Sequence, residues 1–312
     1  MIIGHQKIWQ FLKSSVEIER LSHAYLFFGE ESLGKRKLAK EFIKLLNCQN
    51  SEKPCQTCRS CQDIENEVYP DLILIEPRKK EIQIAQIREL KNSLTLRSYF
   101  GGYKAVIIDD AQALNQEAYS CLLKTLEEPL GKAVLILVAS TRESLPKTIL
   151  SRVEQIKFKK VPSIEIENYL KNQGAKEKEA KEISLISKNK PGLAINYFQE
   201  SDKLEKEKKF IQDFLKIKKS PLGIRFQYVK DLTENQNLRE VLKIWLRFLR
   251  DVLLSKIGVK HHEIFKDFYP EVENFTIPKL KRILNLCQNI HSLISSTNVN
   301  QKLALEMLLL EL

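Results

Sequence analysis

The sequence predicts an α/β domain built on a parallel sheet, followed by helical domains without strands. Up to about residue 160, apolar runs of strand length alternate with amphipathic stretches of helix length, which is typical of a parallel sheet covered by helices. A compact group of cysteines interrupts this alternation. After Pro162 the strand signals fade and apolar residues recur at helical spacing. We therefore expect an α/β domain at 1–161 with a zinc module at about 48–61, a small helical domain at 162–207 and an all-helical domain at 208–312.

Length and composition indicate a soluble protein. The 312 residues, 43% of them hydrophobic, are enough for two or three cores. No apolar run approaches the roughly 18 residues of a membrane span, and the N-terminus lacks a signal-peptide layout. We therefore expect a cytoplasmic protein with no membrane partner. The net charge of +11 favours polyanions such as nucleic acid, although many lysines share helices with glutamates and would form solvated faces.

The chain begins with a predicted helix, strand, glycine loop and second helix. Apolar residues between positions 5 and 22 recur at helical spacing, and Tyr25 to Phe28 form a short apolar run that ends at a glycine. After the loop, apolar residues again share one face of a helix from Lys35 to Leu46. This order of elements is the context that a phosphate-binding loop requires.

The stretch LFFGEESLGKRKL, residues 26–38, nearly matches the phosphate-binding motif G-x-x-x-x-G-K-[ST]. Gly29, Gly34 and Lys35 occupy their positions in the motif. Arg36 stands where the motif needs a hydroxyl group to ligate Mg²⁺. The loop therefore has the architecture of a nucleotide site without one of its chemical parts.

Four cysteines follow the second helix at the spacing C-x6-C-x2-C-x2-C: Cys48, Cys55, Cys58 and Cys61. Four thiolates can close a tetrahedron around Zn²⁺, and each C-x2-C step places two sulfurs on one tight turn. Because sulfur fills all four positions, such a zinc site is structural and has no open place for water. The alternative is a set of reduced surface thiols.

The remaining strands of the α/β domain alternate with helices. The predicted strands are Asp71–Glu76, Ala105–Ile108, Ala133–Ala139 and Glu154–Phe158. The predicted helices are Ile82–Leu96 and Gln116–Glu128, the second of which ends at Pro129, and Tyr99–Tyr103 is a predicted turn.

Acidic and hydroxyl side chains follow two of these strands. Asp109 and Asp110 come directly after the third strand, as in a Walker B site, where one carboxylate helps to hold Mg²⁺. Ser140 and Thr141 come after the next strand, at the end where open α/β sheets face their ligands. We take Asp109, Asp110 and Thr141 as candidates for a vestigial nucleotide site with Gly29, Gly34 and Lys35.

The rest of the chain is predicted to be helical. Residues 164–170 and 176–186 indicate two short helices, Lys190–Gly192 a turn, and Leu193 to Phe198 the start of another helix. The charged stretch Lys203–Lys209 is interpreted as a linker or an exposed helical turn. The apolar stripes beyond it are typical of a bundle core that could also offer an assembly surface.

Together these motifs resemble the bacterial DNA polymerase III clamp-loader family of AAA+ proteins. The resemblance is strong over residues 1 to about 160, and the helical remainder matches by pattern and length. The residues that carry it are His23–Phe27, the four cysteines, Tyr69–Asp71, Ile107–Ala111, Leu122–Pro129 (LLKTLEEP) and Thr148–Arg152.

The resemblance implies an architecture and a role. The fold would be an AAA+ RecA-like domain followed by a helical lid and a helical collar, through which five subunits form a ring. The partners would be gamma/tau and delta subunits, and the complex would load the sliding clamp onto primed DNA.

The resemblance also separates this chain from the family's ATPase motor, the gamma/tau subunit. Arg36 replaces the hydroxyl residue, Asp110 with Ala111 replaces the water-activating glutamate of the motor, and Pro191–Ala194 in the lid lack a basic sensor residue. ATP is therefore not expected in the chain's own site, and no intrinsic ATPase activity is expected. The alternative is an active or nucleotide-binding subunit of the gamma/tau type, in which Lys35 holds the phosphates and Asp109 the metal.

One catalytic element of the family is retained at Ser151-Arg152, which is similar to its Ser-Arg-Cys motif except that Val153 replaces the cysteine. In the family, this arginine reaches into a neighbour's ATP site as a finger in trans. A guanidinium suits that task because it is always charged and offers a planar fork of donors. The alternative for Arg152 is a surface salt bridge.

Overall fold

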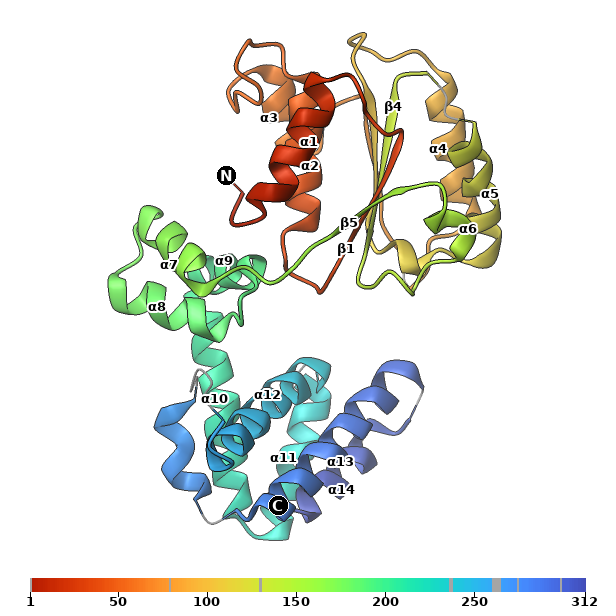
Figure 1. The fold of residues 1–312 in the computed structure, drawn as a ribbon. Helices are drawn as coiled ribbons and strands as arrows, with labels where there is room; N and C mark the ends of the chain where they lie inside the picture. The colour runs from red at the N-terminus through yellow and green to blue at the C-terminus, as the bar shows by residue number, and fades with distance from the viewer. Residues whose placement is uncertain are drawn as a thin grey trace. The chain divides into compact units, whose positions relative to one another are not determined.

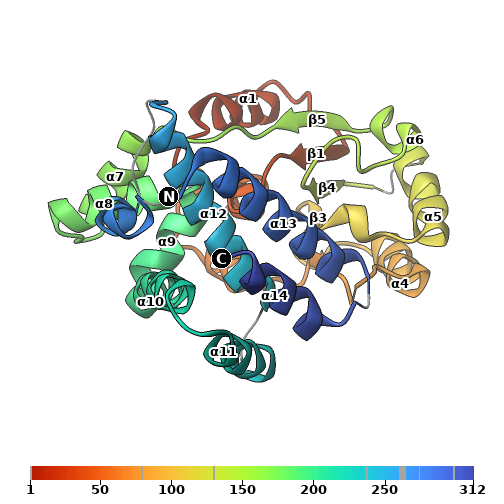
Figure 2. The same cartoon turned by 90° about the horizontal axis from the view of Figure 1, so that it is seen from below.

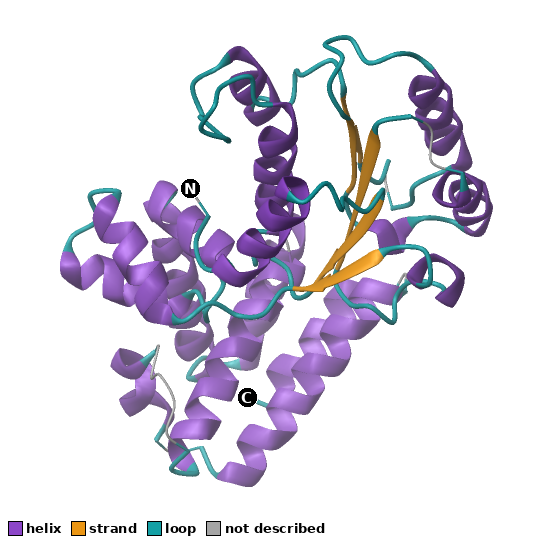
Figure 3. Ribbon diagram, turned by 45° about the horizontal axis from the view of Figure 1, so that its top comes forward, coloured by secondary structure: helices purple, strands orange, loops and turns teal. Residues whose placement is uncertain are grey.

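The computed structural model describes residues 2–78, 80–128, 131–235, 238–259, 265–273, 275–297 and 299–312. The chain folds as two compact units, Met1–Ile195 and Asn196–Leu312 (Figure 1). All strands of the described residues lie in the first unit, and the second unit is helical where it is described (Figure 3). No described helix combines the length and the apolar character needed to cross a membrane. The predicted division into three domains stays a prediction.

The first unit is built on five parallel strands in the order β2-β3-β4-β1-β5. The strands are β1 (Ala24–Phe28), β2 (Leu72–Ile75), β3 (Lys104–Ile108), β4 (Ala133–Ala139) and β5 (Glu154–Lys157). The predicted parallel α/β sheet is thus confirmed, with strand ends within two residues of those expected. Because β4 and β1 are neighbours but distant in sequence, helical crossovers must cover the sheet.

Helices cover both faces of this sheet (Figure 1). One face packs against α1 (Gln6–Glu17), α2 (Lys35–Asn47) and α3 (Arg59–Glu65), and the other against α4 (Ile84–Thr95), α5 (Gln116–Glu127) and α6 (Lys147–Leu150). Alternate residues of β4 divide between the two cores, with Leu135 and Leu137 on one side and Ile136 on the other. A short 3₁₀ turn, η1 (Ala111–Ala113), follows β3.

The first unit also contains residues 162–195 of the small helical domain predicted at 162–207. They form α7 (Ser163–Asn172), α8 (Glu177–Ile186) and α9 (Pro191–Gln199), and the last of these continues into the second unit. The predicted turn at Lys190–Gly192 is therefore wrong in part, because Pro191 begins a helix. Proline is favoured at the first helical position, since its missing N–H would have no partner there.

The second unit is a helical bundle: α10 (Ser201–Lys218), α11 (Leu222–Asn235), α12 (Leu238–Lys256), η2 (Lys266–Val272), α13 (Ile277–Ser296) and α14 (Gln301–Leu310). The stretch Lys203–Lys209, interpreted as a linker or an exposed helical turn, lies inside α10, so the helical alternative holds and the linker does not. The predicted boundary between residues 207 and 208 also falls within this helix. Lysine and glutamate are good helix formers, so a stretch of mixed charge does not by itself end a helix.

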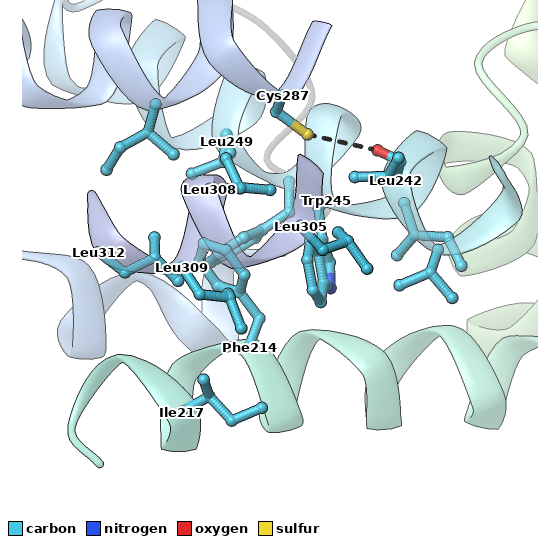
Figure 4. Packing of buried hydrophobic residues seen from close by; sticks show 14 of the residues in the cluster. Phe214, Ile217, Leu242, Trp245, Leu249, Cys287, Leu305, Leu308, Leu309 and Leu312 are labelled. Carbon is cyan, nitrogen blue, oxygen red and sulfur yellow. Dashed lines mark hydrogen bonds between the residues drawn. The ribbon is translucent and has the colours of Figure 1, made fainter. Parts of the chain in front are cut away.

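Aromatic and leucine side chains fill the core of the bundle (Figure 4). Helix α12 packs against α13, as Figure 2 shows, and α14 packs against α11 and α13. Trp245 of α12 is fully buried beside Phe214 and donates its indole N–H to the carbonyl oxygen of Phe210 at 3.1 Å. The predicted bundle core is therefore confirmed for the stripe on α12.

Candidate functional site

The glycine loop joins β1 to α2 at the carboxyl edge of the sheet, as the sequence predicts. Gly34 has a left-handed backbone with φ of 86° and is the residue before the 13-residue helix α2. Gly29 has φ of 149°, and a Cβ atom there would lie 2.6 Å from the carbonyl oxygen of Phe158. Both positions therefore need glycine, the first for its backbone and the second also for a close approach.

We expect Gly29→Ala to destabilise the first unit by about 1–3 kcal/mol, since the alanine adds backbone strain and a clash with fixed backbone. Gly174→Ala is the matched control: Gly174 also has positive φ, but a Cβ atom there meets nothing within 4 Å. The urea unfolding midpoint of each variant measures the effect. Equal midpoints would contradict a cost from the contact with Phe158.

The ammonium group of Lys35 is turned toward the loop itself. Its Nζ donates to the carbonyl oxygens of Gly29 at 2.5 Å and Glu30 at 2.7 Å. Burial lowers the pKa of Lys35, although the nearby charge of Asp109 opposes this shift. The lysine that would contact phosphates in a nucleotide site thus donates to the chain's own carbonyls.

The guanidinium of Arg36 lies among three carboxylates. It pairs with Glu67 at 2.7 Å, with Asp109 at 3.4 Å and with Glu76. Burial alone would lower the pKa of Arg36, but the hydrogen bond to Glu67 and the charges of Glu76 and Glu67 outweigh it and raise the pKa. Burial raises the pKa of Asp109, and Arg36 opposes that rise. A cation from the chain therefore contacts the acid predicted to hold Mg²⁺.

The other two predicted residues of this site lie at its edge. Asp110 has a left-handed backbone and accepts a hydrogen bond from the Gln112 side chain at 2.9 Å. Thr141 is exposed after β4, and its carbonyl oxygen accepts a hydrogen bond from Ser144 at 2.6 Å. The structure thus gathers Gly29, Gly34, Lys35 and Asp109 around the loop, while the hydrogen bond at Thr141 joins it to its own turn.

The loop is also held by residues that sequence reasoning missed. The backbone N–H of Gly192, in α9, donates to the carbonyl oxygen of Ser32 at 2.8 Å, and a Cβ atom at Gly192 would lie 2.9 Å from that oxygen. Glu30 pairs with Lys190 at 2.9 Å and with Lys160 at 3.1 Å. Hydrogen bonding to Lys190 lowers the pKa of Glu30. No local pattern indicated these contacts, because the partners are far apart in sequence.

The four predicted cysteines come together. Cys48 follows α2, Cys58 precedes α3 and Cys61 lies within α3. Their four Sγ atoms all lie within 4.8 Å of one another, and the distance from Cys48 to Cys58 is 3.9 Å. A tetrahedral zinc site with Zn–S bonds of about 2.3 Å requires S···S distances of about 3.8 Å. The cluster could therefore hold a metal ion such as zinc.

The thiols of the cluster differ in their surroundings. The backbone N–H of Cys58 donates to Cys55 Sγ at 3.2 Å and lowers the pKa of Cys55 to about 6. Burial raises the pKa of Cys61 to about 12. Cys48 and Cys61 are buried, so a set of four surface thiols is not what the structure contains. A bound cation would favour the thiolate form at every position.

Arg152 follows α6 and makes a surface ion pair. Its Nη2 lies 2.7 Å from Glu127 Oε1, and its Nη1 donates to the carbonyl oxygen of Thr148 at 2.9 Å. The side chain of Arg152 is 36% exposed and that of Glu127 49%. Exposed pairs contribute about 0–1 kcal/mol. The salt bridge considered as an alternative is present, but it is weak enough to be exchanged for another anion.

Family models match both parts of the chain. The model described as DNA polymerase III, delta subunit, matches residues 4–162, and the model for the C-terminal part of the same subunit matches residues 201–312. The first match covers the sheet, the glycine loop and the cysteines. The second covers most of the helical unit.

Curated relatives are also DNA polymerase III subunits. The chain is 27% identical over 320 residues to the delta' subunit of Bacillus subtilis (strain 168), a match that covers 98% of this chain and 95% of the relative. It is 33% identical over 164 residues to the tau subunit of the same organism, but that match spans only 29% of tau. The similarity to tau is therefore confined to a part of each protein.

A solved structure with a similar fold is the gamma subunit-related protein of DNA polymerase III from Thermotoga maritima. It aligns with a TM-score of 0.51 and 19% identity, over 96% of this chain and 97% of that chain. At this identity the match concerns the fold alone.

Proposed function

Because the chain belongs to the DNA polymerase III delta-subunit family, we propose that it acts as a non-hydrolysing clamp-loader subunit of the delta-prime type. In this role it joins gamma/tau and delta subunits in a five-subunit ring of AAA+ proteins in the cytoplasm. The complex loads the sliding clamp onto primed DNA. The observation that carries the non-hydrolysing role is the contact between Arg36 and Asp109.

Two features of the loop disfavour phosphoryl transfer. Catalysis of this reaction depends on a metal ion and on donors placed around the phosphates. Arg36 supplies no hydroxyl ligand and puts a positive charge 3.4 Å from the carboxylate that would bind Mg²⁺. Lys35 already donates to two backbone carbonyls. A bound nucleotide would have to displace both cations from their internal partners.

The alternative is an active or nucleotide-binding subunit of the gamma/tau type. It is favoured by Gly34 and Lys35, which keep their motif positions before a long helix whose free N–H groups suit an anion. Under this alternative, Asp109 would exchange Arg36 for Mg²⁺.

We expect the purified chain to show no Mg²⁺-dependent ATP turnover above a protein-free blank. Steady-state phosphate release measures this, and equilibrium binding of labelled ATP is measured beside it. Turnover that disappears in Lys35→Ala would contradict the proposal and establish the alternative, whereas binding without turnover would assign a nucleotide-holding role. Arg36→Ser is the informative comparison, since it restores the hydroxyl and frees Asp109. Stronger Mg²⁺-dependent ATP binding by this variant would show that Arg36 is what weakens nucleotide binding in the wild type.

We propose that Arg152 completes the ATP site of a neighbouring gamma/tau subunit in trans. The residue is partly exposed, its planar fork of donors suits phosphate oxygens, and its internal partner Glu127 is a surface carboxylate. The finger would exchange Glu127 for phosphate when the subunits assemble.

We further propose a structural zinc ion at the four cysteines and an assembly surface on the helical unit. The zinc proposal is supported by an all-sulfur ligand set at tetrahedral spacing.

The proposal of an assembly surface is supported by exposed apolar residues on α14. Leu303, Met307 and Leu310 are each more than half exposed and are spaced so as to share one side of the helix.

A further inference from the structure

Helix α2 carries a row of basic residues that faces the cysteines' own segment, residues 48–67, here called the cysteine module. Arg36, Lys40 and Lys44 are spaced four residues apart, so they follow one face of the helix. Each of them contacts a residue of the cysteine module. The helix that begins at the glycine loop is thus joined along its length to the candidate metal site.

The C-terminal end of the row, at Lys44, is buried. Lys44 and Glu41 have side chains only 3% and 5% exposed and pair at 2.8 Å. Lys44 also donates to Gln56 at 2.9 Å and to Glu65 at 2.5 Å, and Gln56 donates to Glu41 at 2.6 Å. Gln56 lies between the ligands Cys55 and Cys58. Because buried charges require partners, this network fixes the turn that carries two of the four sulfurs.

The row continues from Lys44 toward the glycine loop. Lys40 donates to the carbonyl oxygen of Glu65 at 3.0 Å and pairs with the Glu67 carboxylate at 2.6 Å. The same Glu67 oxygen accepts from Arg36 at 2.7 Å. Glu65 is the last residue of α3, the helix that contains Cys61. Any shift of α3 would therefore move the carboxylate that holds Arg36.

The N-terminal end of the row, at Arg36, contacts residues that follow two strands of the sheet. Arg36 pairs with Glu76, which follows β2, and with Asp109, which follows β3. Glu67 is thus the partner that the cysteine module contributes, while Glu76 and Asp109 come from the carboxyl edge of the sheet. A continuous set of polar contacts connects the cysteines with the acid of the glycine-loop site.

We propose that this row is an outer shell of the metal site, which holds the cysteine module in ligating geometry, and that metal binding in turn holds Arg36 on Asp109. The inference rests on the metal site proposed above. Loss of an outer-shell partner of a metal ligand commonly weakens metal affinity by about 10–100-fold. Because coupling between two sites is reciprocal, an effect of Arg36's partners on metal affinity requires an effect of the metal on Arg36.

The first test is Zn²⁺ affinity, measured on the full chain by competition with a chromophoric chelator. We expect Lys44→Met to weaken Zn²⁺ binding roughly 10–100-fold and Glu67→Gln to weaken it less. Glu67→Gln keeps size and lies near the surface, so it remains informative if Lys44→Met fails to fold. The control is Lys91→Gln, at an exposed lysine of α4 on the opposite face of the sheet, which we expect to bind Zn²⁺ as the wild type does.

The second test is hydrogen exchange of the backbone amides at the start of α2. If the row acted only on its immediate neighbours, exchange there would not depend on the metal. We expect removal of Zn²⁺ to raise exchange there in the wild type, and Glu67→Gln to show raised exchange with Zn²⁺ bound. Stoichiometric Zn²⁺ binding with equal affinity in Glu67→Gln and Lys91→Gln would overturn the coupling alone. A wild-type chain that binds no Zn²⁺ would overturn the metal proposal and this inference together.

Discussion

Removal of the metal from the four cysteines is expected to lower the melting temperature of the first unit by roughly 8–16 °C. A ligand present at about 1,000 times its Kd stabilises a fold by about 4 kcal/mol. For a domain of this size, each kcal/mol corresponds to about 2–4 °C. The loss should begin in the cysteine module, where short loops and the seven-residue α3 surround the sulfurs.

Thermal unfolding with and without a chelator measures this effect, together with metal analysis of gently purified protein. Cys61→Ser should have the low melting temperature of the chelated protein and no further response to chelator, because it removes a buried ligand. Cys121→Ser is the control, since Cys121 lies on α5 outside the cluster. Substoichiometric zinc in the purified protein, or a wild-type melting temperature that chelator does not change, would count against a zinc site at the four cysteines.

Arg152→Ala is expected to slow ATP hydrolysis at the adjoining subunit's site by about 10³–10⁵-fold, the range that arginine fingers contribute elsewhere. The fold of the chain should be unaffected, because the pair with Glu127 is exposed and contributes at most about 1 kcal/mol. Single-turnover hydrolysis in the reconstituted, DNA-bound complex measures the step at that site.

Glu127→Gln is the matched control for the finger. It breaks the same ion pair but keeps the guanidinium, so hydrolysis should remain near the wild-type rate. Arg152→Lys keeps the charge and loses the planar fork, and it should recover only part of the rate. An unchanged rate in Arg152→Ala would refute the assignment.

Local patterns in the sequence predicted the main elements of the first unit. The alternation of apolar runs and amphipathic helices gave the parallel sheet, and the spacing of Gly29, Gly34 and Lys35 gave the loop between β1 and α2. The cysteine spacing predicted the cluster, since three of the four sulfurs lie within seven residues. Each of these features depends on residues close together in the chain.

The partners of the loop could not be predicted in the same way. Arg36 meets Glu67 and Glu76, which are 31 and 40 residues away, and nothing in its own surroundings indicates them. Gly192 approaches Ser32 because the chain returns to the loop after five strands. Such contacts follow from tertiary packing between segments that are far apart in the chain.

The most direct test of the central claim compares Lys35→Met with Arg152→Ala in the reconstituted complex, after gel filtration has shown that both variants assemble. If chemistry occurs in the neighbour's site and not in the chain's own, Lys35→Met will leave DNA-stimulated hydrolysis close to the wild-type rate and Arg152→Ala will abolish it at the adjoining site. Loss of hydrolysis with Lys35→Met and a normal rate with Arg152→Ala would contradict both the non-hydrolysing role of the chain and the arginine finger.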